Sequence, residues 1–128
     1  MPIRLSQGGT LGRLGLFVVL AIFILLFGFG STSASGGLVS APWDKIVHFC
    51  VFATLVVGLR VTMPGLSALT IGALALCIGL ADELHQYFVP DRQPELDDWL
   101  ADLAGTLCGL LVWRKLARLP FFGEQCRP

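Results

Sequence analysis

Charged residues are scarce in this sequence of 128 residues. Asp, Glu, Lys and Arg make up only 14% of it, hydrophobic residues make up 55%, and the mean hydropathy is +0.76. Because an ordinary soluble domain contains about 25% charged residues, a water-soluble fold is not expected. The nine basic and nine acidic residues also cancel, so the chain lacks the basic surface that nucleic-acid binding requires.

The sequence also lacks the cysteine and histidine spacings of well-known sites. Its four cysteines form no C-x-x-C pair, and three of them lie within apolar runs, where cysteine behaves as a small hydrophobic residue. Neither H-x-x-x-H nor H-E-x-x-H occurs. A disulfide framework or a cysteine-based metal site is therefore not expected, and the sequence requires no cofactor.

What the sequence does contain is a series of four long apolar runs with short connections. A membrane-spanning helix needs about 20 such residues, so four spans use nearly the whole length. We expect an all-α, four-helix transmembrane bundle that forms a single domain over 1–128, with helices at about 11–30, 43–62, 66–88 and 98–116. The alternative for the first run is a cleaved signal peptide, although the run is long for one.

The connections indicate how the helices are joined and oriented. Residues 31–41 are small and polar and predict a loop, whereas Pro64-Gly65 predicts a tight turn between antiparallel helices. Lys45 and Arg92 are the two basic residues on one side of the membrane, and the other side has seven: Arg4, Arg13, Arg60, Arg114, Lys115, Arg118 and Arg127. Because cytoplasmic loops are the basic ones, we expect both termini in the cytoplasm, with the lipid bilayer around the helices.

Nearly all acidic residues then lie at the outer face, where three helix ends meet. The polar residues expected there are Asp44, Lys45, His48, Asp82, Glu83, Gln86, Arg92, Asp98 and Asp102. Ionisable groups at this depth are costly unless they face water or the protein interior and find partners. Because carboxylates near a helix C-terminus oppose the helix dipole, we expect Arg92 to pair with Glu83 or Asp98.

Simpler roles are open for some of these residues. His48 alone could be a hydrogen-bonded packing residue, and Asp44 could serve only as a helix-start residue. Asp91, Glu95 and Asp97 are expected to be solvated loop charges.

Two glycines continue the acidic stripe of the last helix. Asp98 and Asp102 are four residues apart, and Gly105 and Gly109 follow on the same face as a G-x-x-x-G seam. Such a seam lets another helix approach closely. We expect it to pack helices together, and a homo-oligomer through the same seam is a further possibility.

Read together, these residues resemble the VanZ-like family of bacterial membrane proteins. The matching strings are Asp44-Lys45-x-x-His48, Asp82-Glu83-x-His85-Gln86-x-Phe88-x-Pro90-x-Arg92 and Asp98-x-x-x-Asp102-x-x-Gly105, and the resemblance covers about residues 44–113. In two departures, Asp102 stands where many members have asparagine, and Asp91 stands where a glycine commonly precedes the arginine. The founding member is associated with resistance to the lipidated glycopeptide teicoplanin, so the resemblance implies a role at the cell envelope without supplying a mechanism.

Three functions are open at this point. The first is a binding or accessory role at the outer membrane face, for a lipid-linked envelope component or a glycopeptide. The second is an intramembrane hydrolase or transferase, in which Glu83 and Asp98 or Asp102 act as base and acid, or hold Mg²⁺, Mn²⁺ or Zn²⁺ together with His48. No nucleophilic serine or cysteine stands beside the cluster, which disfavours an enzyme. The third is a small structural or transport subunit.

Overall fold

Helices account for all the regular secondary structure in the residues that the computed structural model describes, which are 9–29, 42–90 and 92–125. They are α1 (Thr10–Phe23), continued by a π-helical segment η1 (Ile24–Phe29), then α3 (Trp43–Thr62), α4 (Ala68–Gln86), α5 (Leu96–Leu116) and α6 (Pro120–Gln125). The expected all-α class is confirmed. The loop expected at 31–41 and the loop charge Asp91 lie outside the described residues.

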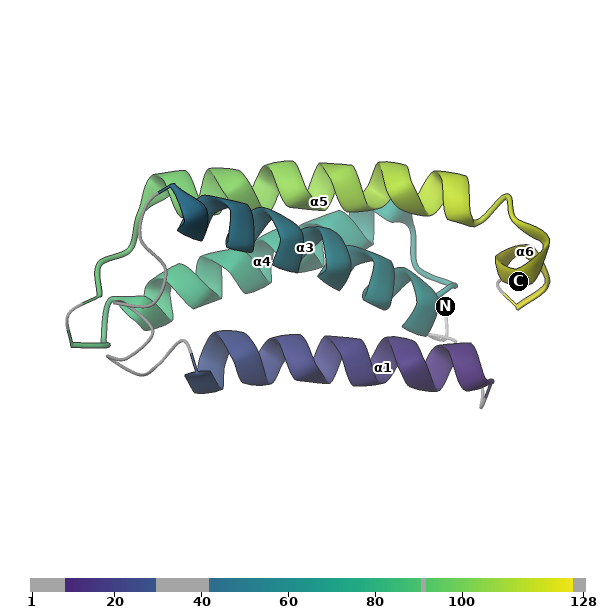
Figure 1. The fold of residues 1–128 in the computed structure, drawn as a ribbon, viewed down its shortest axis with the longest axis horizontal. Coiled ribbons are helices and arrows are strands. Elements are labelled where there is room, and N and C mark those ends of the chain that lie inside the picture. Colours follow the sequence, from purple (N-terminus) through teal and green to yellow (C-terminus); the bar gives the residue numbers. More distant parts are fainter. Residues whose placement is uncertain (1–8, 30–41, 91, 126–128) are drawn as a thin grey trace.

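Successive long helices run in opposite directions along the molecule. The start of α3, the end of α4 and the start of α5 lie at one end of the bundle, as Figure 1 shows. The start of α1 and the ends of α3 and α5 lie at the other end (Figure 1). Between α3 and α4, the Leu66 backbone N–H donates to the Met63 carbonyl at 3.1 Å, which closes the tight turn expected at Pro64-Gly65.

The bounds of α4 differ from the expected 66–88 for local reasons. Ser67 caps the helix, because its hydroxyl accepts a hydrogen bond from the backbone N–H of Thr70 at 3.0 Å, so α4 begins at Ala68. The helix ends at Gln86, and residues 87–88 continue the chain as a turn. The last polar residues of α4 therefore still project from regular helix.

α5 begins at Leu96, two residues before the expected start. The backbone N–H groups of Asp98 and Trp99 both donate to the carbonyl of Glu95, at 3.1 and 3.4 Å, and form the first turn. Asp97 and Asp98 thus lie in that first turn, where the helix dipole favours a negative charge.

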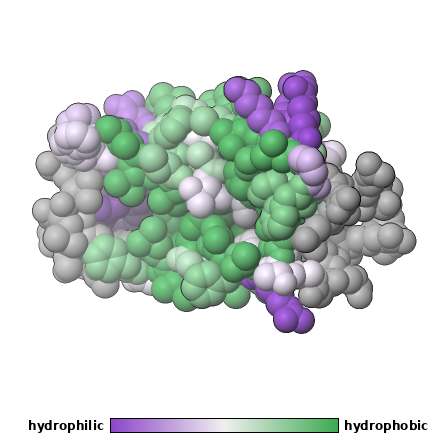
Figure 2. Space-filling model, turned by 45° about the vertical axis from the view of Figure 1, so that its right-hand side comes forward, coloured by the Kyte–Doolittle hydropathy of each residue, from purple (hydrophilic) through white to green (hydrophobic). Residues whose placement is uncertain are grey.

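Three helical stretches among the described residues are long and apolar enough to cross a membrane: residues 10–29, α3 and α4. The fourth expected span, α5, is not among these three stretches, because its 21 residues include five charged ones. They are Asp97, Asp98, Asp102, Arg114 and Lys115. Hydrophobic residues cover most of the middle of the molecule in Figure 2, and hydrophilic residues lie toward its ends.

α3 occupies the centre of the bundle, between α1 and α5 (Figure 1). Its Phe52 and Leu55 side chains are fully buried. Toward α5 the contact is between backbones, because a Cβ added at Gly109 would lie 2.6 Å from the carbonyl oxygen of Ala53, and one at Gly105 would meet the carbonyl of the α3 residue one turn earlier. The G-x-x-x-G seam therefore holds α3 of the same chain, and this face of α5 is not free for a second copy.

α1 packs on the opposite side of α3 in the same way. A Cβ added at Gly15 would lie 2.7 Å from the Thr62 hydroxyl and 3.1 Å from the carbonyl oxygen of Gly58. Val19 and Ile22 are buried in the same contact layer. The first apolar run is thus a packed helix of the bundle.

Candidate functional site

Polar side chains from three helix ends and one connection gather at the end of the bundle where α3 begins. We call this set the polar cluster; it consists of Asp44, Lys45, His48, Asp82, Glu83, Gln86, Arg92, Asp98 and Asp102. Asp44, Lys45 and Arg92 are partly exposed, and the other members are buried. The structure therefore brings together the residues that the sequence placed at one membrane face.

Lys45 joins the start of α3 to the start of α5. Its ammonium nitrogen lies 3.0 Å from an Asp44 oxygen, 2.6 Å from a Glu95 oxygen and 2.6 Å from Asp98 Oδ1. The Asp98 side chain is only 7% exposed, so this cation compensates a buried carboxylate. Glu95 was expected to be a solvated loop charge; its side chain is half exposed, but it is part of this ion-pair group.

His48 bridges α3 and the second turn of α5. Its Nδ1 lies 2.8 Å from Asp102 Oδ1, and its Nε2 lies 3.8 Å from Asp98 Oδ2, too far for a hydrogen bond. Asp102 is fully buried, and its other oxygen packs against α4 at Gly79, where a Cβ would lie only 2.6 Å away. His48 is thus a buried packing residue whose ring is also oriented by its hydrogen bond to the Asp102 carboxylate.

Arg92 does not form the ion pair that the sequence suggested. Its guanidinium donates to Gln86 Oε1 at 2.9 Å, and the amide of Gln86 in turn donates to Asp82 Oδ2 at 3.0 Å. The hypothesis of an Arg92 pair with Glu83 or Asp98 is therefore wrong. The physical reason is that both carboxylates already have other partners. Asp98 pairs with Lys45, and Glu83 accepts a hydrogen bond from the backbone of the connection before α5.

Glu83 is held by the backbone rather than by a cation. Its Oε2 accepts a hydrogen bond from the backbone N–H of Glu95 at 2.9 Å, which fixes the connection to the end of α4. Its Oε1 is buried and finds no hydrogen-bond donor among the described residues. A buried carboxylate oxygen without a partner costs free energy, so Glu83 Oε1 is a candidate contact for a bound ion or molecule.

Arg92→Ala should lower the stability of the bundle measurably. The substitution removes a hydrogen bond from a charged donor, typically worth about 1.5–3 kcal/mol, and leaves Gln86 free to turn away from Asp82. Thermal unfolding of the purified chain in detergent would measure the effect. Arg118→Ala, an exposed arginine at the other end of the bundle, is the control. Equal melting temperatures for the two variants would contradict the Arg92–Gln86 contact.

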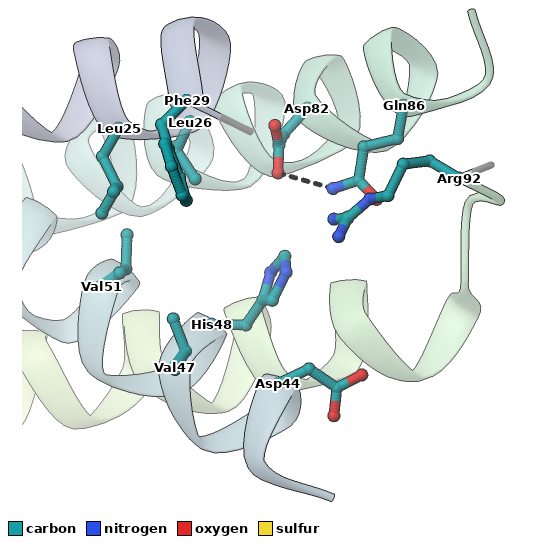
Figure 3. A pocket seen from close by; sticks show the side chains of 10 residues that line it. All are labelled: Leu25, Leu26, Phe29, Asp44, Val47, His48, Val51, Asp82, Gln86 and Arg92. Carbon is teal, nitrogen blue, oxygen red and sulfur yellow. Dashed lines mark hydrogen bonds between the residues drawn. The ribbon is translucent and has the colours of Figure 1, made fainter. Parts of the chain in front are cut away.

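A cavity of about 220 Å³ opens beside the polar cluster, partly exposed to the surroundings (Figure 3). One part of its lining is polar and the other apolar: Asp44, His48, Asp82, Gln86 and Arg92 against Leu25, Leu26, Phe29, Val47 and Val51. Figure 3 shows the His48, Gln86 and Arg92 side chains converging on the polar side, with the leucines on the other side. The cavity is amphipathic, as a site for a molecule with a polar head and an apolar tail would be.

Among the described residues, two groups of side chains have the spacing of metal ligands. In each group, one ligand atom per residue lies within 4.8 Å of the others; the groups are His48, Asp82 and Glu83, and Asp44, Glu95 and Asp98. Lys45 already forms ion pairs with all three members of the second group, so its ammonium occupies the place of a cation there. Among the described residues, no lysine or arginine forms an ion pair with the first group.

The comparison with protein families decides where this chain belongs. The model of the VanZ/LLP1 family matches residues 5–118, which include α1, α3, α4 and α5. The chain belongs to the VanZ/LLP1 family. No curated protein and no solved structure matches the chain. In this VanZ/LLP1 protein the match extends past the motif strings at 44–113 and takes in α1 and η1, and η1 supplies part of the apolar wall of the cavity.

The apolar wall of the cavity was missing from the sequence-based site. Val47 and Val51 could have been found, because they are four residues apart on the helix that carries His48. The wall residues of η1 carry no such signal, since apolar residues occupy every side of that helical segment. Gly79 was also missed, although a small residue three positions before Asp82 is what a close approach of α5 requires.

Proposed function

We propose that this protein is a multi-pass protein of the bacterial cytoplasmic membrane with α5 as its fourth span. The charges of α5 lie in its first two turns and its last turn, and the residues between 103 and 113 are uncharged. The two acidic residues at its deeper positions, Asp98 and Asp102, face the bundle rather than its surroundings. Charges at the ends and polar groups turned inward are compatible with a span.

The proposed orientation places the polar cluster at the outer face and both termini in the cytoplasm. The ends of α3 and α5 carry Arg60, Arg114 and Lys115, at the end of the bundle opposite the polar cluster. Basic residues concentrate on the cytoplasmic side of membrane proteins. The cavity then opens toward the outer leaflet and the extracytoplasmic space.

The function that the geometry supports best is binding of an amphipathic molecule at that face. The observation that carries this proposal is the two-sided lining of the cavity, with His48, Asp82 and Gln86 facing leucine and valine side chains (Figure 3). A polar or cationic head would lie against the carboxylates, while an acyl or prenyl chain would lie along η1 and α3. Lipid-linked envelope components and lipidated glycopeptides share this chemistry, which makes a role in glycopeptide resistance a natural extension.

Filling the apolar half of the cavity should weaken binding at least about tenfold, which corresponds to about 1.4 kcal/mol. Val51→Phe places a ring in the cavity, and Val112→Phe adds the same volume on the outer surface of α5 as the control. Both variants would be reconstituted in lipid nanodiscs and titrated with teicoplanin. The lipids that co-purify with each variant would be identified by mass spectrometry.

The two measurements separate the possible sources of the ligand. Teicoplanin binding that is lost in Val51→Phe and absent for a glycopeptide without an acyl chain would support the lipidated glycopeptide. Selective loss of one co-purified lipid from Val51→Phe would support an envelope lipid. Equal binding and equal lipid content in both variants would overturn the proposal.

A hydrolase or transferase is the second candidate, and the His48–Asp102 pair is the observation that favours it. When a carboxylate is hydrogen-bonded to one nitrogen of an imidazole ring, it orients the second nitrogen to act as a base or a ligand. In His48 this second nitrogen is Nε2, which lies on the side of Asp98 and the cavity. An enzyme would convert the co-purified lipid in the nanodisc assay, whereas a binding protein would return it unchanged.

A further inference from the structure

The charges of the polar cluster do not balance. Lys45 and Arg92 are the two cations of the cluster, and they face four buried carboxylates: Asp82, Glu83, Asp98 and Asp102. With a neutral imidazole at His48, the four buried carboxylates exceed the two cations by two charges, and Lys45 is also shared with the more exposed Asp44 and Glu95. Inside a bundle at membrane depth, uncompensated charges of this kind are strongly unfavourable. Either protons or a bound cation must supply the missing positive charge.

Three residues of the cluster each use one polar atom in a hydrogen bond, and Glu83 has a second one that finds no hydrogen-bond donor among the described residues. His48 is bonded to Asp102 through Nδ1, which leaves Nε2; Asp82 accepts from Gln86 through Oδ2, which leaves Oδ1. Glu83 accepts from the backbone through Oε2, which leaves Oε1, an atom that is buried in a residue only 6% exposed. One ligand atom from each residue lies within 4.8 Å of the other two.

We propose that His48, Asp82 and Glu83 bind a divalent metal ion. The three come from two helices, α3 and α4, and supply one nitrogen and two oxygens, a set that suits Zn²⁺ or Mn²⁺. One such ion supplies the two missing positive charges.

The atoms already engaged have the pattern of a second ligand shell. Metal-binding histidines almost always donate their other ring N–H to a carboxylate or a carbonyl, and Asp102 stands in that place at 2.8 Å from Nδ1. Gln86 and the backbone of Glu95 hold the two carboxylates in the same manner. His48 and Asp82 also line the cavity, which gives the ion a route of entry and leaves room for a water molecule or a ligand head as a further ligand.

In the part of the chain that the structure describes, the proposed site has no lysine or arginine ion-paired with it, unlike the neighbouring acidic group. Asp44, Glu95 and Asp98 all contact the Lys45 ammonium, so they have no need of a metal ion. Asp97 lies in the same helix end but is exposed and belongs to neither group. Asp97→Asn is therefore a matched control for the removal of a carboxylate from this face.

The test uses the full chain in detergent, stripped with a chelator and dialysed against Zn²⁺ or Mn²⁺ separately. We expect about one ion per chain by mass spectrometry in the wild type and in Asp97→Asn, and at least about tenfold weaker binding in Glu83→Gln. Metal content of the wild type no greater than that of Glu83→Gln would overturn the proposal and indicate that protons balance the cluster.

A second measurement needs no substitution. Co²⁺ added to the stripped wild type should give visible absorption bands that change when Zn²⁺ displaces it, and the absence of such bands would count against the site even if Glu83→Gln failed to fold. The inference concerns the cavity of the proposed function but does not depend on its ligand. Metal content is measured without teicoplanin or added lipid, and teicoplanin binding can be repeated in chelator, so the two proposals can fail separately.

Discussion

Gly105→Ala should destabilise the bundle more than any other substitution that adds a single methyl group to α5. The new Cβ would meet the backbone carbonyl of Phe49, which cannot turn away as a side chain can. Overpacking of a well-packed core costs about 1–3 kcal/mol, and a backbone contact places this variant at or above the upper end. The seam also adjoins the site, because Phe49 follows His48 and Gly105 lies one turn after Asp102. Separation of the helices would therefore lengthen the 2.8 Å His48–Asp102 contact as well.

Gly72→Ala is the matched control for this prediction. The added Cβ would lie 3.5 Å from the end of the Leu110 side chain, an ordinary contact, and alanine favours a helix over glycine by up to about 1 kcal/mol. Thermal unfolding in detergent, followed by the fraction of protein that stays monodisperse, should show a large loss for Gly105→Ala and none for Gly72→Ala. If both variants had the same melting temperature as the wild type, the close packing of α3 on α5 would be disproved.

The helices themselves could be predicted because the signals are strong and local. Apolar runs of about 20 residues, the Pro64-Gly65 turn and the acidic start of the last helix each carry a physical reason for a boundary. The errors of two residues came from a serine cap and from a first turn built on a Glu95 carbonyl, both of which depend on backbone geometry. The seam glycines predicted a close helix contact but could not name the partner, which is α3 rather than a second chain.

The location of the polar cluster could be predicted as well, because topology alone brings three helix ends to one face. Its pairing could not. Whether Arg92 reaches Glu83, Asp98 or Gln86 depends on the path of the connection between α4 and α5, and no periodic pattern determines that path. The apolar wall from η1 was equally hidden, because a uniformly apolar helix does not reveal in its sequence which face it turns to its neighbours.

Lys45→Met should be the most damaging change within the polar cluster. It removes the cation that lies 2.6 Å from Asp98 and leaves that carboxylate buried and without a counter-charge. Removal of one partner from a buried ion pair costs about 3–5 kcal/mol; because the Lys45 side chain is 23% exposed, we expect the lower end of this range. The thermal unfolding of Lys115→Met, an exposed lysine at the opposite end, supplies the baseline for loss of a positive charge.

The damage from Lys45→Met should be reversible in two ways that a general folding defect would not allow. Asp98→Asn in the same chain removes the orphaned charge, so the double variant should be more stable than Lys45→Met alone. Removal of the ammonium also leaves Asp44, Glu95 and Asp98 as an oxygen-rich group with metal-ligand spacing, so Ca²⁺ should raise the melting temperature of Lys45→Met and not that of the double variant. A melting temperature of Lys45→Met that neither Asp98→Asn nor Ca²⁺ raises would show that Lys45 acts through packing of its aliphatic stem and not through its charge.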